Sequence, residues 1–255
     1  MARLSAQFVL ALLLIESARA GWAVTSSQTE SAGRGGVEHR QVVLTESENN
    51  ERATLDLALF STKSVTLRVI DNPAGEDNLA EAMQRENCVA GVNGGYFDPE
   101  DKPVGLLISD GKLIAPLRKA RLLSGVMVVS QGRMQLLRAV EYSSKGKTNA
   151  ALQCGPFLVD RGQPVPGLND SRSARRTFVF TGGYDRGAIG FCSSVTLAQL
   201  AKILATPGLA PGLKLQRALN LDGGSSSAFW FAGERGRFSI AEQKTVRDFV
   251  GVVPK

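Results

Sequence analysis

Two stretches of the chain each hold a pair of short apolar runs joined by a turn dipeptide. The first reads VGLLISDGKLIAPL, over 104–117, and the second reads SGVMVVSQGRMQLL, over 124–137. Asp-Gly and Gln-Gly favour the backbone conformations of tight hairpin turns, so each stretch predicts two antiparallel strands. Two hairpins in succession constrain the chain to a fold that contains an antiparallel sheet.

Hydrophobic spacing in the rest of the chain indicates more strands and two helices. Apolar and polar residues alternate over 53–60 and 64–70, which is the period of half-buried strands. The capped, amphipathic stretches 78–86 and 196–205 predict helices. The expected fold class is therefore α+β: a single domain of mixed, mostly antiparallel sheet with a few helices. Apolar runs predict the remaining strands at 88–92, 151–159, 177–180, 188–191, 218–221 and 228–231.

The first forty residues carry signals for export. In residues 1–20 a positively charged start and an apolar run precede Ala18-Arg19-Ala20, the small-x-small pattern of a signal-peptide cleavage site. The apolar run is shorter than the roughly 18 residues that a membrane anchor needs. We therefore expect a periplasmic or secreted protein without a stable membrane anchor after cleavage. Residues 21–40 are polar and lack a period, which is typical of a flexible leader, so the folded domain is expected over 41–255.

Composition narrows the classes of function. The formal net charge is +6, but the basic residues are scattered and no recognition motif accompanies them, so no nucleic-acid partner is expected. The only histidine, His39, lies in the expected leader, which disfavours a Ser-His-Asp or Cys-His nucleophile. Neither a zinc-site nor a calcium-loop spacing is visible, so no metal and no cofactor is predicted. Three cysteines, Cys88, Cys154 and Cys192, permit one disulfide, and the sequence leaves open both their pairing and the oligomeric state.

The stretch NLDGGSSSAFWF, over 220–231, places an acid, two glycines and three serines between two strand-like runs. Gly223 and Gly224 allow a ligand to come close to the main chain, and Asp222 beside hydroxyl groups suits a polar substrate. The alternative is an Asp-Gly hairpin turn that the serines only solvate.

A second stretch, GVNGGYFD over 91–98, repeats this design with a buried strand, two glycines, aromatic residues and a carboxylate. Aromatic faces beside acids and amides are typical of sugar sites, because sugar rings stack on them while the polar groups bind hydroxyls. The alternative without a binding role is a turn followed by aromatic residues of the hydrophobic core.

Gly155-Pro156 interrupts an apolar strand and indicates a bulge or an edge. Adjacent Arg175 and Arg176 can bind phosphate or carboxylate, or form a solvated pair.

These motifs together resemble one known family. GVNGGYFD, QCGPFLV, ARRT and ALNLDGGSSS have the order and spacing found in the phosphodiester glycosidase family, over roughly 89–231 and extending towards 253. NGGYFD with a later NLDGGxS is the specific part of the pattern. The chain departs from the family after Arg-Thr, where Phe178-Val179-Phe180 replaces a small residue, a branched apolar residue and glycine.

The resemblance implies a glycosidase that hydrolyses a sugar-1-phosphodiester, of the N-acetylglucosamine-1-phosphate type, to free sugar and phosphomonoester. Its partner would be a carbohydrate or glycan phosphodiester. The implied catalytic residues are Asp222, Asp98 and Arg176, with Asp222 as nucleophile or base and Arg176, or else Arg175, stabilising the departing phosphate. Substrate binding and the shape of the site are assigned to Asn93, Gly94, Gly95, Tyr96, Phe97, Gly155, Arg175, Thr177, Asn220, Gly223, Gly224, Ser225 and Ser226.

Two other functions fit the same loops. A noncatalytic envelope protein could bind carbohydrate through them, because family resemblance does not fix function. A hydrolase of an unphosphorylated envelope polysaccharide is the other alternative. That enzyme would need no arginine to bind phosphate, so phosphate analogues should inhibit it weakly.

Overall fold

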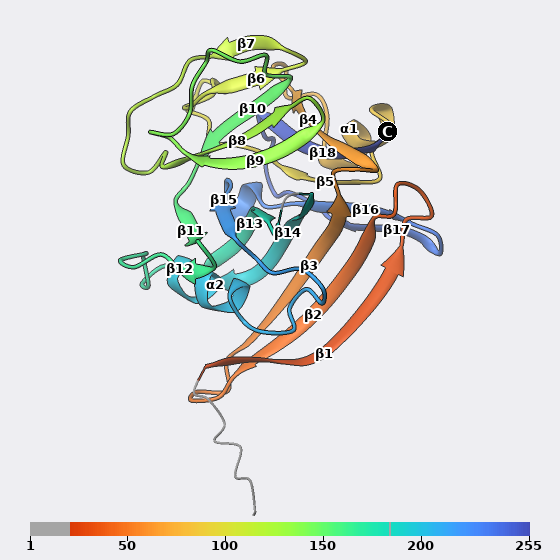
Figure 1. Ribbon diagram of the computed structural model, residues 1–255, viewed down its shortest axis with the longest axis vertical. Helices are drawn as coiled ribbons and strands as arrows, with labels where there is room; N and C mark the ends of the chain where they lie inside the picture. Colours follow the sequence, from red (N-terminus) through yellow and green to blue (C-terminus); the bar gives the residue numbers. More distant parts are fainter. Residues whose placement is uncertain (1–20, 184) are drawn as a thin grey trace, which may run out of the picture.

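The computed structural model describes residues 21–183 and 185–255, and its strands form one eight-stranded and two five-stranded sheets. Every strand pair in these residues is antiparallel. Figure 1 shows most of the eight-stranded sheet in the lower half of the molecule, with most strands of the five-stranded sheets above it. The predicted signal peptide, 1–20, lies outside the described residues.

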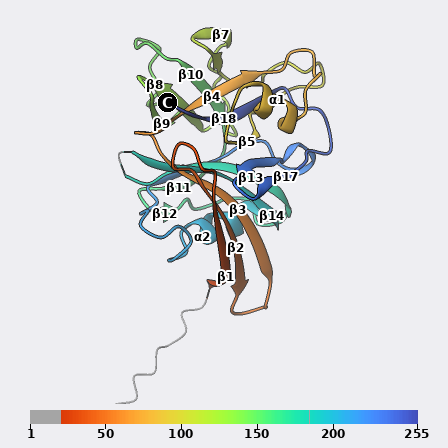
Figure 2. The ribbon, with the colours of Figure 1, turned by 90° about the vertical axis from the view of Figure 1, so that its right-hand side faces the viewer.

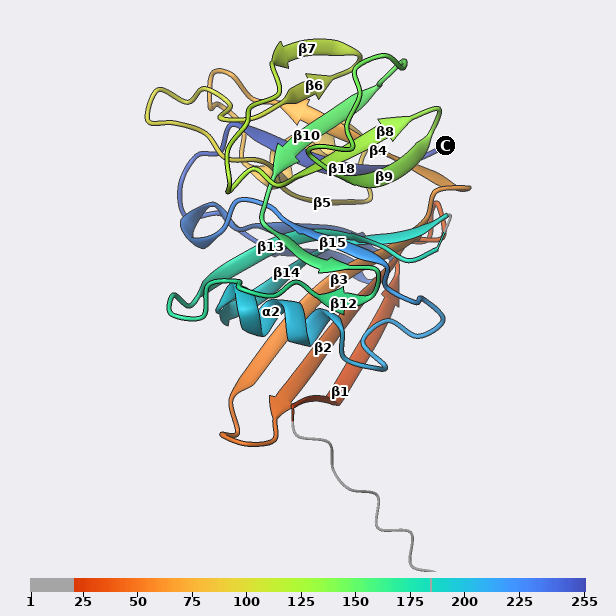
Figure 3. The ribbon, with the colours of Figure 1, turned by 60° about the vertical axis from the view of Figure 1, so that its left-hand side comes forward.

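The eight-stranded sheet carries the longest strands of the molecule. Its outer face, away from the other sheets, is covered by α2 (Leu197–Leu204), as Figure 3 shows. Leu200 and Leu204 of this helix pack against Phe178 and Phe180 of the sheet. In spatial order the strands are β1 (Trp22–Ser31), β2 (Glu38–Glu46), β3 (Arg52–Ser61), β14 (Arg186–Val195), β13 (Ala174–Thr181), β15 (Arg217–Asn220), β11 (Phe157–Asp160) and β12 (Gln163–Pro164).

Two smaller sheets stack above the eight-stranded sheet, and Figure 2 shows them from the side. One has the order β7 (Lys112–Ala115), β6 (Leu107–Ser109), β10 (Ala150–Cys154), β8 (Gly125–Ser130) and β9 (Arg133–Arg138). The other has the order β17 (Gly236–Ile240), β16 (Phe229–Gly233), β5 (Ala90–Asn93), β18 (Asp248–Pro254) and β4 (Val65–Asp71). Helix α1 (Leu79–Arg85) packs on this second sheet, where Leu79 and Met83 contact Trp230 and Phe249.

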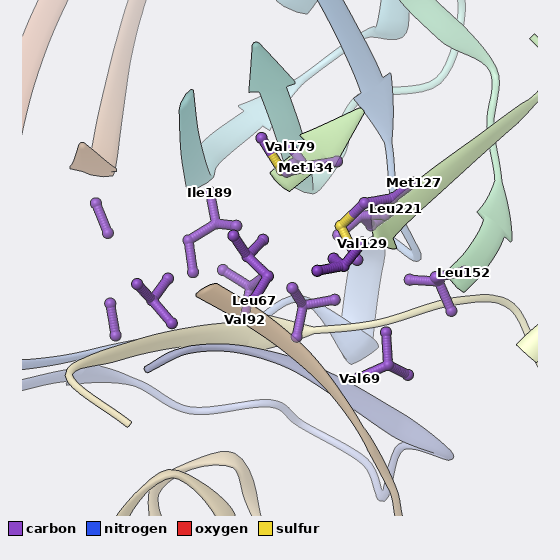
Figure 4. Packing of buried hydrophobic residues seen from close by; sticks show 14 of the residues in the cluster. Leu67, Val69, Val92, Met127, Val129, Met134, Leu152, Val179, Ile189 and Leu221 are labelled. Carbon is purple, nitrogen blue, oxygen red and sulfur yellow. The ribbon is translucent and has the colours of Figure 1, made fainter. Parts of the chain in front are cut away.

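The main hydrophobic core lies between the sheets and draws residues from all three. Figure 4 shows Leu67 and Val92 from one five-stranded sheet, Met127 from the other, and Val179 and Ile189 from the eight-stranded sheet. Because each sheet contributes one apolar face to this core, removal of any sheet would expose the others.

Both predicted helices are confirmed, and each begins with a capping box. Asn78 accepts a hydrogen bond from the backbone of Glu81, and the Glu81 side chain bonds back to the Asn78 backbone. Thr196 and Gln199 make the same reciprocal pair at the start of α2. These bonds satisfy backbone N–H groups that have no partner inside a helix, which explains the starting points of such short helices.

Two expectations about the fold need correction. The fold is predominantly β, with 47% of residues in strands and 8% in helices, and the sheets are not mixed. Short hairpins join some of the antiparallel neighbours, such as β1–β2, β6–β7 and β8–β9, while others, such as β4–β18, are far apart in the chain. Residues 21–40 are also not a flexible leader throughout, because 22–31 form β1 and pair with β2 over its whole length. Their polar residues face solvent at the edge of the sheet, so no hydrophobic period marks this strand.

The expected strand 151–159 is two strands in different sheets. The chain passes from β10 in a five-stranded sheet to β11 in the eight-stranded sheet at Gly155-Pro156.

The three cysteines, Cys88, Cys154 and Cys192, are buried free thiols, and burial raises the pKa of Cys88 to about 12. Neither α1 nor α2, the helices of the described part, is long and apolar enough to cross a membrane.

Candidate active site

The two Gly-Gly loops meet where β5 and β15 end, although these strands belong to different sheets. The backbone N–H of Asp222 donates to the carbonyl oxygen of Gly94 at 3.0 Å. The side-chain amide of Asn93 donates to the carbonyl oxygen of Asp222 at 2.8 Å. The structure therefore brings the two sequence motifs into direct contact.

The side chain of Asn93 stabilises this contact through further hydrogen bonds. Its Oδ1 accepts a hydrogen bond from Thr177 Oγ1 at 2.7 Å and another from the backbone N–H of Ala228 at 3.0 Å. Both Asn93 and Thr177 are buried. Since their polar atoms are occupied by protein groups, these two residues hold the loop in place and do not face a ligand.

Asp222 is half-buried, and its Oδ1 accepts a hydrogen bond from the backbone N–H of Gly223 at 2.9 Å. Burial raises the pKa of the Asp222 carboxyl above its ordinary value. The nearby Ser226 hydroxyl, the Gly223 N–H and the positive charge of Lys244 act in the opposite direction. The carboxylate is thus accessible to a ligand and more basic than an ordinary aspartate.

Arg176 lies beside the same loop with an unpaired charge. Its Nε donates to the Val195 carbonyl at 3.0 Å and its Nη2 to the Arg172 carbonyl at 2.7 Å. A Cβ atom at Gly223 would lie 3.6 Å from Arg176 Nη1, so this nitrogen is directed towards Gly223. Burial lowers the pKa of Arg176, and no ion pair involves it among the described residues. A buried guanidinium without a counter-ion is suited to an anionic ligand.

Arg175, the neighbouring residue of β13, binds backbone carbonyl groups next to the site. Its Nη2 donates to the carbonyl oxygens of Ser227 and Ala241, the latter at 3.0 Å. Its guanidinium also lies 5.5 Å from the ring centroid of Phe191. Both arginines retain donors near the site: Arg176 Nη1 is directed towards Gly223, and Arg175 Nε is buried without a partner.

Buried polar atoms without a hydrogen-bond partner cluster at this site. Six such side-chain atoms occur in the described residues, and only Asp160 Oδ1 lies elsewhere, where it pairs with Arg217. Buried polar groups are normally satisfied, so a cluster of unsatisfied ones indicates a place where a polar ligand or water binds. The other five are Arg175 Nε, Asn220 Oδ1, Ser226 Oγ, Ser227 Oγ and Asp248 Oδ2.

Tyr96, Asn220 and Gly155 form a second cluster next to Asp222. The Tyr96 hydroxyl donates to the Gly155 carbonyl, and Asn220 Nδ2 donates to the Tyr96 hydroxyl at 3.1 Å and to the Gly155 carbonyl at 2.9 Å. A Cβ atom at Gly155 would collide with the carbonyl oxygen of Leu122. Glycine is needed here because two backbone segments approach each other.

Phe97 and Asp98 each have a partner within the protein. Lys244 Nζ lies 4.6 Å from the ring centroid of Phe97, so one ring face contacts a cation. Asp98 Oδ1 accepts hydrogen bonds from the backbone N–H groups of Glu100 and Lys102, at 3.0 and 2.9 Å. The carboxylate thus stabilises its own turn, as Asp side chains commonly do. The ring of Tyr96 packs against the main core.

Two residues near the site, Lys244 and Asp248, were not predicted from the sequence. Lys244 lies over Phe97 and contributes to the charge around Asp222. Asp248 lies behind Gly94 and Gly95, and its Oδ1 accepts a hydrogen bond from the Gly95 N–H at 2.8 Å. Neither belongs to a motif or to a periodic pattern, so no local signal could have identified them. Their positions depend on the pairing of β18 with β5 and on the loop before β18.

The departure from the family pattern at Phe178-Val179-Phe180 lies outside the site. Phe178 and Phe180 belong to the core under α2, with ring centroids 6.3 Å apart, and Val179 belongs to the main core. The substitution therefore changes packing and leaves the polar residues of the site in place.

The chain is similar to a known family and to solved structures. The sequence model of the family described as phosphodiester glycosidase matches residues 86–253, which include both Gly-Gly loops and the arginine pair. No curated protein sequence matches the chain.

The solved structures that resemble the fold include two with TM-scores above 0.6. One is the catalytic domain of zebrafish N-acetylglucosamine-1-phosphodiester alpha-N-acetylglucosaminidase, auto-inhibited by its pro-peptide, with a TM-score of 0.65 and 15% identity over 92% of this chain and 89% of that chain. The other is a hypothetical protein from Synechocystis, with a TM-score of 0.61 and 13% identity over 86% of this chain and 62% of that chain. At these identities the likeness shows a shared fold.

Proposed function

Because this chain belongs to the phosphodiester glycosidase family, we propose that it hydrolyses a sugar-1-phosphodiester to free sugar and phosphomonoester. The observation that carries the proposal is the meeting of a carboxylate and a guanidinium at Gly223. The Gly223 N–H donates to Asp222 Oδ1, and the same glycine faces Arg176 Nη1. A sugar-1-phosphodiester needs these two groups, one at the anomeric carbon and one at the phosphate.

The chemistry of the leaving group explains why one carboxylate and one arginine suffice. Cleavage between the anomeric carbon and oxygen releases a phosphate, which is a weak base and needs little protonation by an acid. Arg176 stabilises the negative charge that develops on this phosphate, with a guanidinium already oriented by two backbone carbonyls. No strong general acid is then required.

Asp222 acts on the sugar side of the bond, as the nucleophile or as the base that activates water. Its raised pKa makes the carboxylate a better proton acceptor near neutral pH than an ordinary aspartate. The glycines at 223 and 224 leave room for the sugar beside it, and Ser225, Ser226 and Asn220 are candidates for bonds to its hydroxyl groups.

Other residues predicted for the site receive positioning roles in this proposal. Asn93 and Thr177 hold the Asp222 loop, and Asp98 shapes the turn that carries Phe97. Phe97 contributes a ring at the edge of the site, shared with Lys244. Asp98 therefore supports the site and does not react.

The finer identity of the substrate and the place of action extend the proposal. We take the sugar to be of the N-acetylglucosamine-1-phosphate type, in agreement with the activity named for the zebrafish relative. We also take the protein to be exported to the periplasm or beyond, on the basis of the signal sequence in residues 1–20.

The test is a substrate panel incubated with the purified protein lacking residues 1–20 and followed by mass spectrometry. The panel holds sugar-1-phosphodiesters, the matching glycosides without phosphate, and envelope polysaccharides. Asp222→Asn removes the reactive carboxylate, while Asp101→Asn makes the same change at an exposed position as a control. Free sugar and phosphomonoester released by the wild type and Asp101→Asn, and not by Asp222→Asn, is the expected result.

Other outcomes of the panel select the alternatives. Release from the unphosphorylated polysaccharide alone would identify a different hydrolase. Binding of glycan by folded protein, with no product from any member, would identify a noncatalytic carbohydrate-binding protein.

A further inference from the structure

Asp248 is a fully buried carboxyl that the proposed reaction does not use. It is the first residue of β18 and is 1% exposed. Oδ1 accepts a hydrogen bond from the Gly95 N–H at 2.8 Å, while the buried Oδ2 has no partner. The backbone carbonyl of Asp248 accepts a hydrogen bond from the Gly94 N–H, also at 2.8 Å. Asp248 thus binds both glycines of the NGG motif.

One peptide group connects Asp248 to Asp222. The Gly94 carbonyl and the Gly95 N–H belong to the same peptide group. That carbonyl accepts from the Asp222 backbone N–H at 3.0 Å, and that N–H donates to Asp248 Oδ1. Hydrogen bonds in series polarise one another, so a change of charge on Asp248 is felt at the backbone of Asp222.

The glycine at position 94 is explained by this arrangement. A Cβ atom there would collide with Asp248 Oδ1 and approach the Asp248 backbone to 3.0 Å. Gly94 and Asp248 are therefore one packing unit, in which the missing side chain makes room for the carboxyl.

Charged groups surround Asp248 from several elements. Asp222 follows β15, Asp71 lies directly opposite on β4, and Arg247, which pairs with Asp71, precedes it in the chain. The Cys154 thiol of β10 also lies within electrostatic range, and burial raises its pKa, so it is uncharged. Burial raises the pKa of Asp248 to about 7, with further increases from Asp71 and Asp222 and decreases from the Gly95 N–H and Arg247.

We propose that Asp248 is a positioning residue for the hydrolysis, coupled to Asp222 through the Gly94–Gly95 peptide group, and that its protonated form maintains the active arrangement. This inference rests on the proposed glycosidase function. The neutral carboxyl holds the loop through Oδ1 and adds no charge to the site. Loss of the proton places a second negative charge behind Asp222, and activity declines.

The proposal predicts the shape of the pH profile of kcat/KM. For the wild type we expect a rising limb as Asp222 ionises and a falling limb near pH 7 as Asp248 ionises. Asp248→Asn keeps an acceptor oxygen for Gly95 and cannot ionise. The falling limb should therefore disappear, or move by more than about one pH unit, with a maximum close to that of the wild type.

A second buried carboxyl provides the matched control. Asp56 is 2% exposed, lies on β3 and is bonded to His39, away from the Gly-Gly loops. Asp56→Asn should keep both limbs of the profile even if it lowers stability. An unchanged falling limb in Asp248→Asn would overturn the proposal.

An activity-independent measurement separates this inference from the proposed function. The carboxyl carbon of Asp248 can be followed by NMR through a pH titration of protein labelled at aspartate. Asp248 should titrate near pH 7 in the wild type and at lower pH in Asp222→Asn, because the neighbouring charge is gone. If no substrate is hydrolysed but this shift occurs, the function is wrong and the coupling stands. If Asp248 titrates identically in both proteins, the coupling is wrong whatever the activity.

Discussion

The side chain of Asn93 joins three segments that lie far apart in sequence. Its amide group donates to Asp222, and its oxygen accepts from Thr177 and from Ala228. An aspartate could not replace it, because a carboxylate has no donor for the Asp222 carbonyl. At the scale of single residues, the position of the Asp222 loop therefore depends on hydrogen bonds from the Asn93 side chain.

Asn93→Ala should lower the free energy of unfolding by about 2–4 kcal/mol, because it leaves buried donors and an acceptor without partners. Thr177→Val is the matched variant: it removes one of the three bonds and should cost about 1 kcal/mol. Denaturation in urea, followed by circular dichroism, measures both values. An equal cost for the two variants would contradict the role assigned to Asn93.

Asp248 also predicts how stability changes with pH. Its carboxyl pKa is about 7 in the folded protein and near 3.8 in an ordinary environment. Between these values the unfolded chain loses a proton that the folded protein keeps, so the free energy of unfolding should fall as pH rises from about 4 to 7. The contribution present below pH 4 and lost above pH 7 is on the order of 4 kcal/mol.

The measurement is urea denaturation of the wild type and Asp248→Asn at several pH values. The variant cannot release this proton, so its stability should fall less over the same range. Parallel stability curves for the two proteins would show that Asp248 titrates normally.

At the scale of elements, the site is built where strands leave their sheets. The Asp222 loop follows β15, the Gly94–Gly95 loop follows β5, and Gly155 lies between β10 and β11. Backbone groups at strand ends are free of ladder hydrogen bonds and can bind other groups. This explains the concentration of glycines and polar side chains at these three points.

Gly155→Ala tests this packing of backbone segments. The added Cβ would meet the Leu122 carbonyl, which belongs to the backbone and cannot move without shifting its loop. We expect a loss of about 1–3 kcal/mol in stability and a displaced Tyr96–Asn220 cluster. Thermal unfolding measures the stability of both this variant and the control, Gly146→Ala. In Gly146→Ala the added methyl meets no atom within 4 Å, so this variant should keep wild-type stability. Equal stability of the two variants would disprove the steric requirement at Gly155.

Local sequence patterns predicted the elements that depend on neighbouring residues. The Asp-Gly and Gln-Gly hairpins form β6–β7 and β8–β9, and the capping residues mark the starts of both helices. Strands β1, β2, β12, β17 and β18 were not predicted. Of these, β1, β12 and β17 lie at sheet edges, and β1 and β17 are mostly exposed or half-buried, so no hydrophobic period marks them. Pairing between distant segments, which places β5 between β16 and β18, has no local signature.

The site likewise has features that local sequence motifs predict and features that depend on contacts between distant segments. Asp222, Arg176 and both Gly-Gly loops lie in recognisable motifs, and the fold brings them together. The direction of each arginine, the engagement of Asn93 and the burial of Asp248 depend on β13 and β18 and on their neighbours in the sheets. Spacing along the chain contains no information about those contacts.

At the scale of the whole molecule, the site lies at the junction of three sheets that share one core. Ion pairs reinforce the sheet boundary on another side, where Arg138 of β9 binds Asp160 of β11 at 2.8 Å. Arg217 of β15 binds Asp160 and Glu141, and the guanidinium of Arg138 lies 4.6 Å from the ring centroid of Phe157. These contacts keep the sheets in a fixed relation, which the meeting of Asp222 and Gly94 requires.

In the proposed reaction, the molecule breaks the bond between the sugar and the phosphate oxygen, with Asp222 acting at the sugar. Hydrolysis of a sugar-1-phosphodiester in water enriched in oxygen-18, followed by mass spectrometry of both products, tests this claim most directly. The wild type and Asp101→Asn should place the label on the free sugar and release unlabelled phosphomonoester, whereas Asp222→Asn should release neither. Label in the phosphate, or wild-type rates in Asp222→Asn, would contradict it.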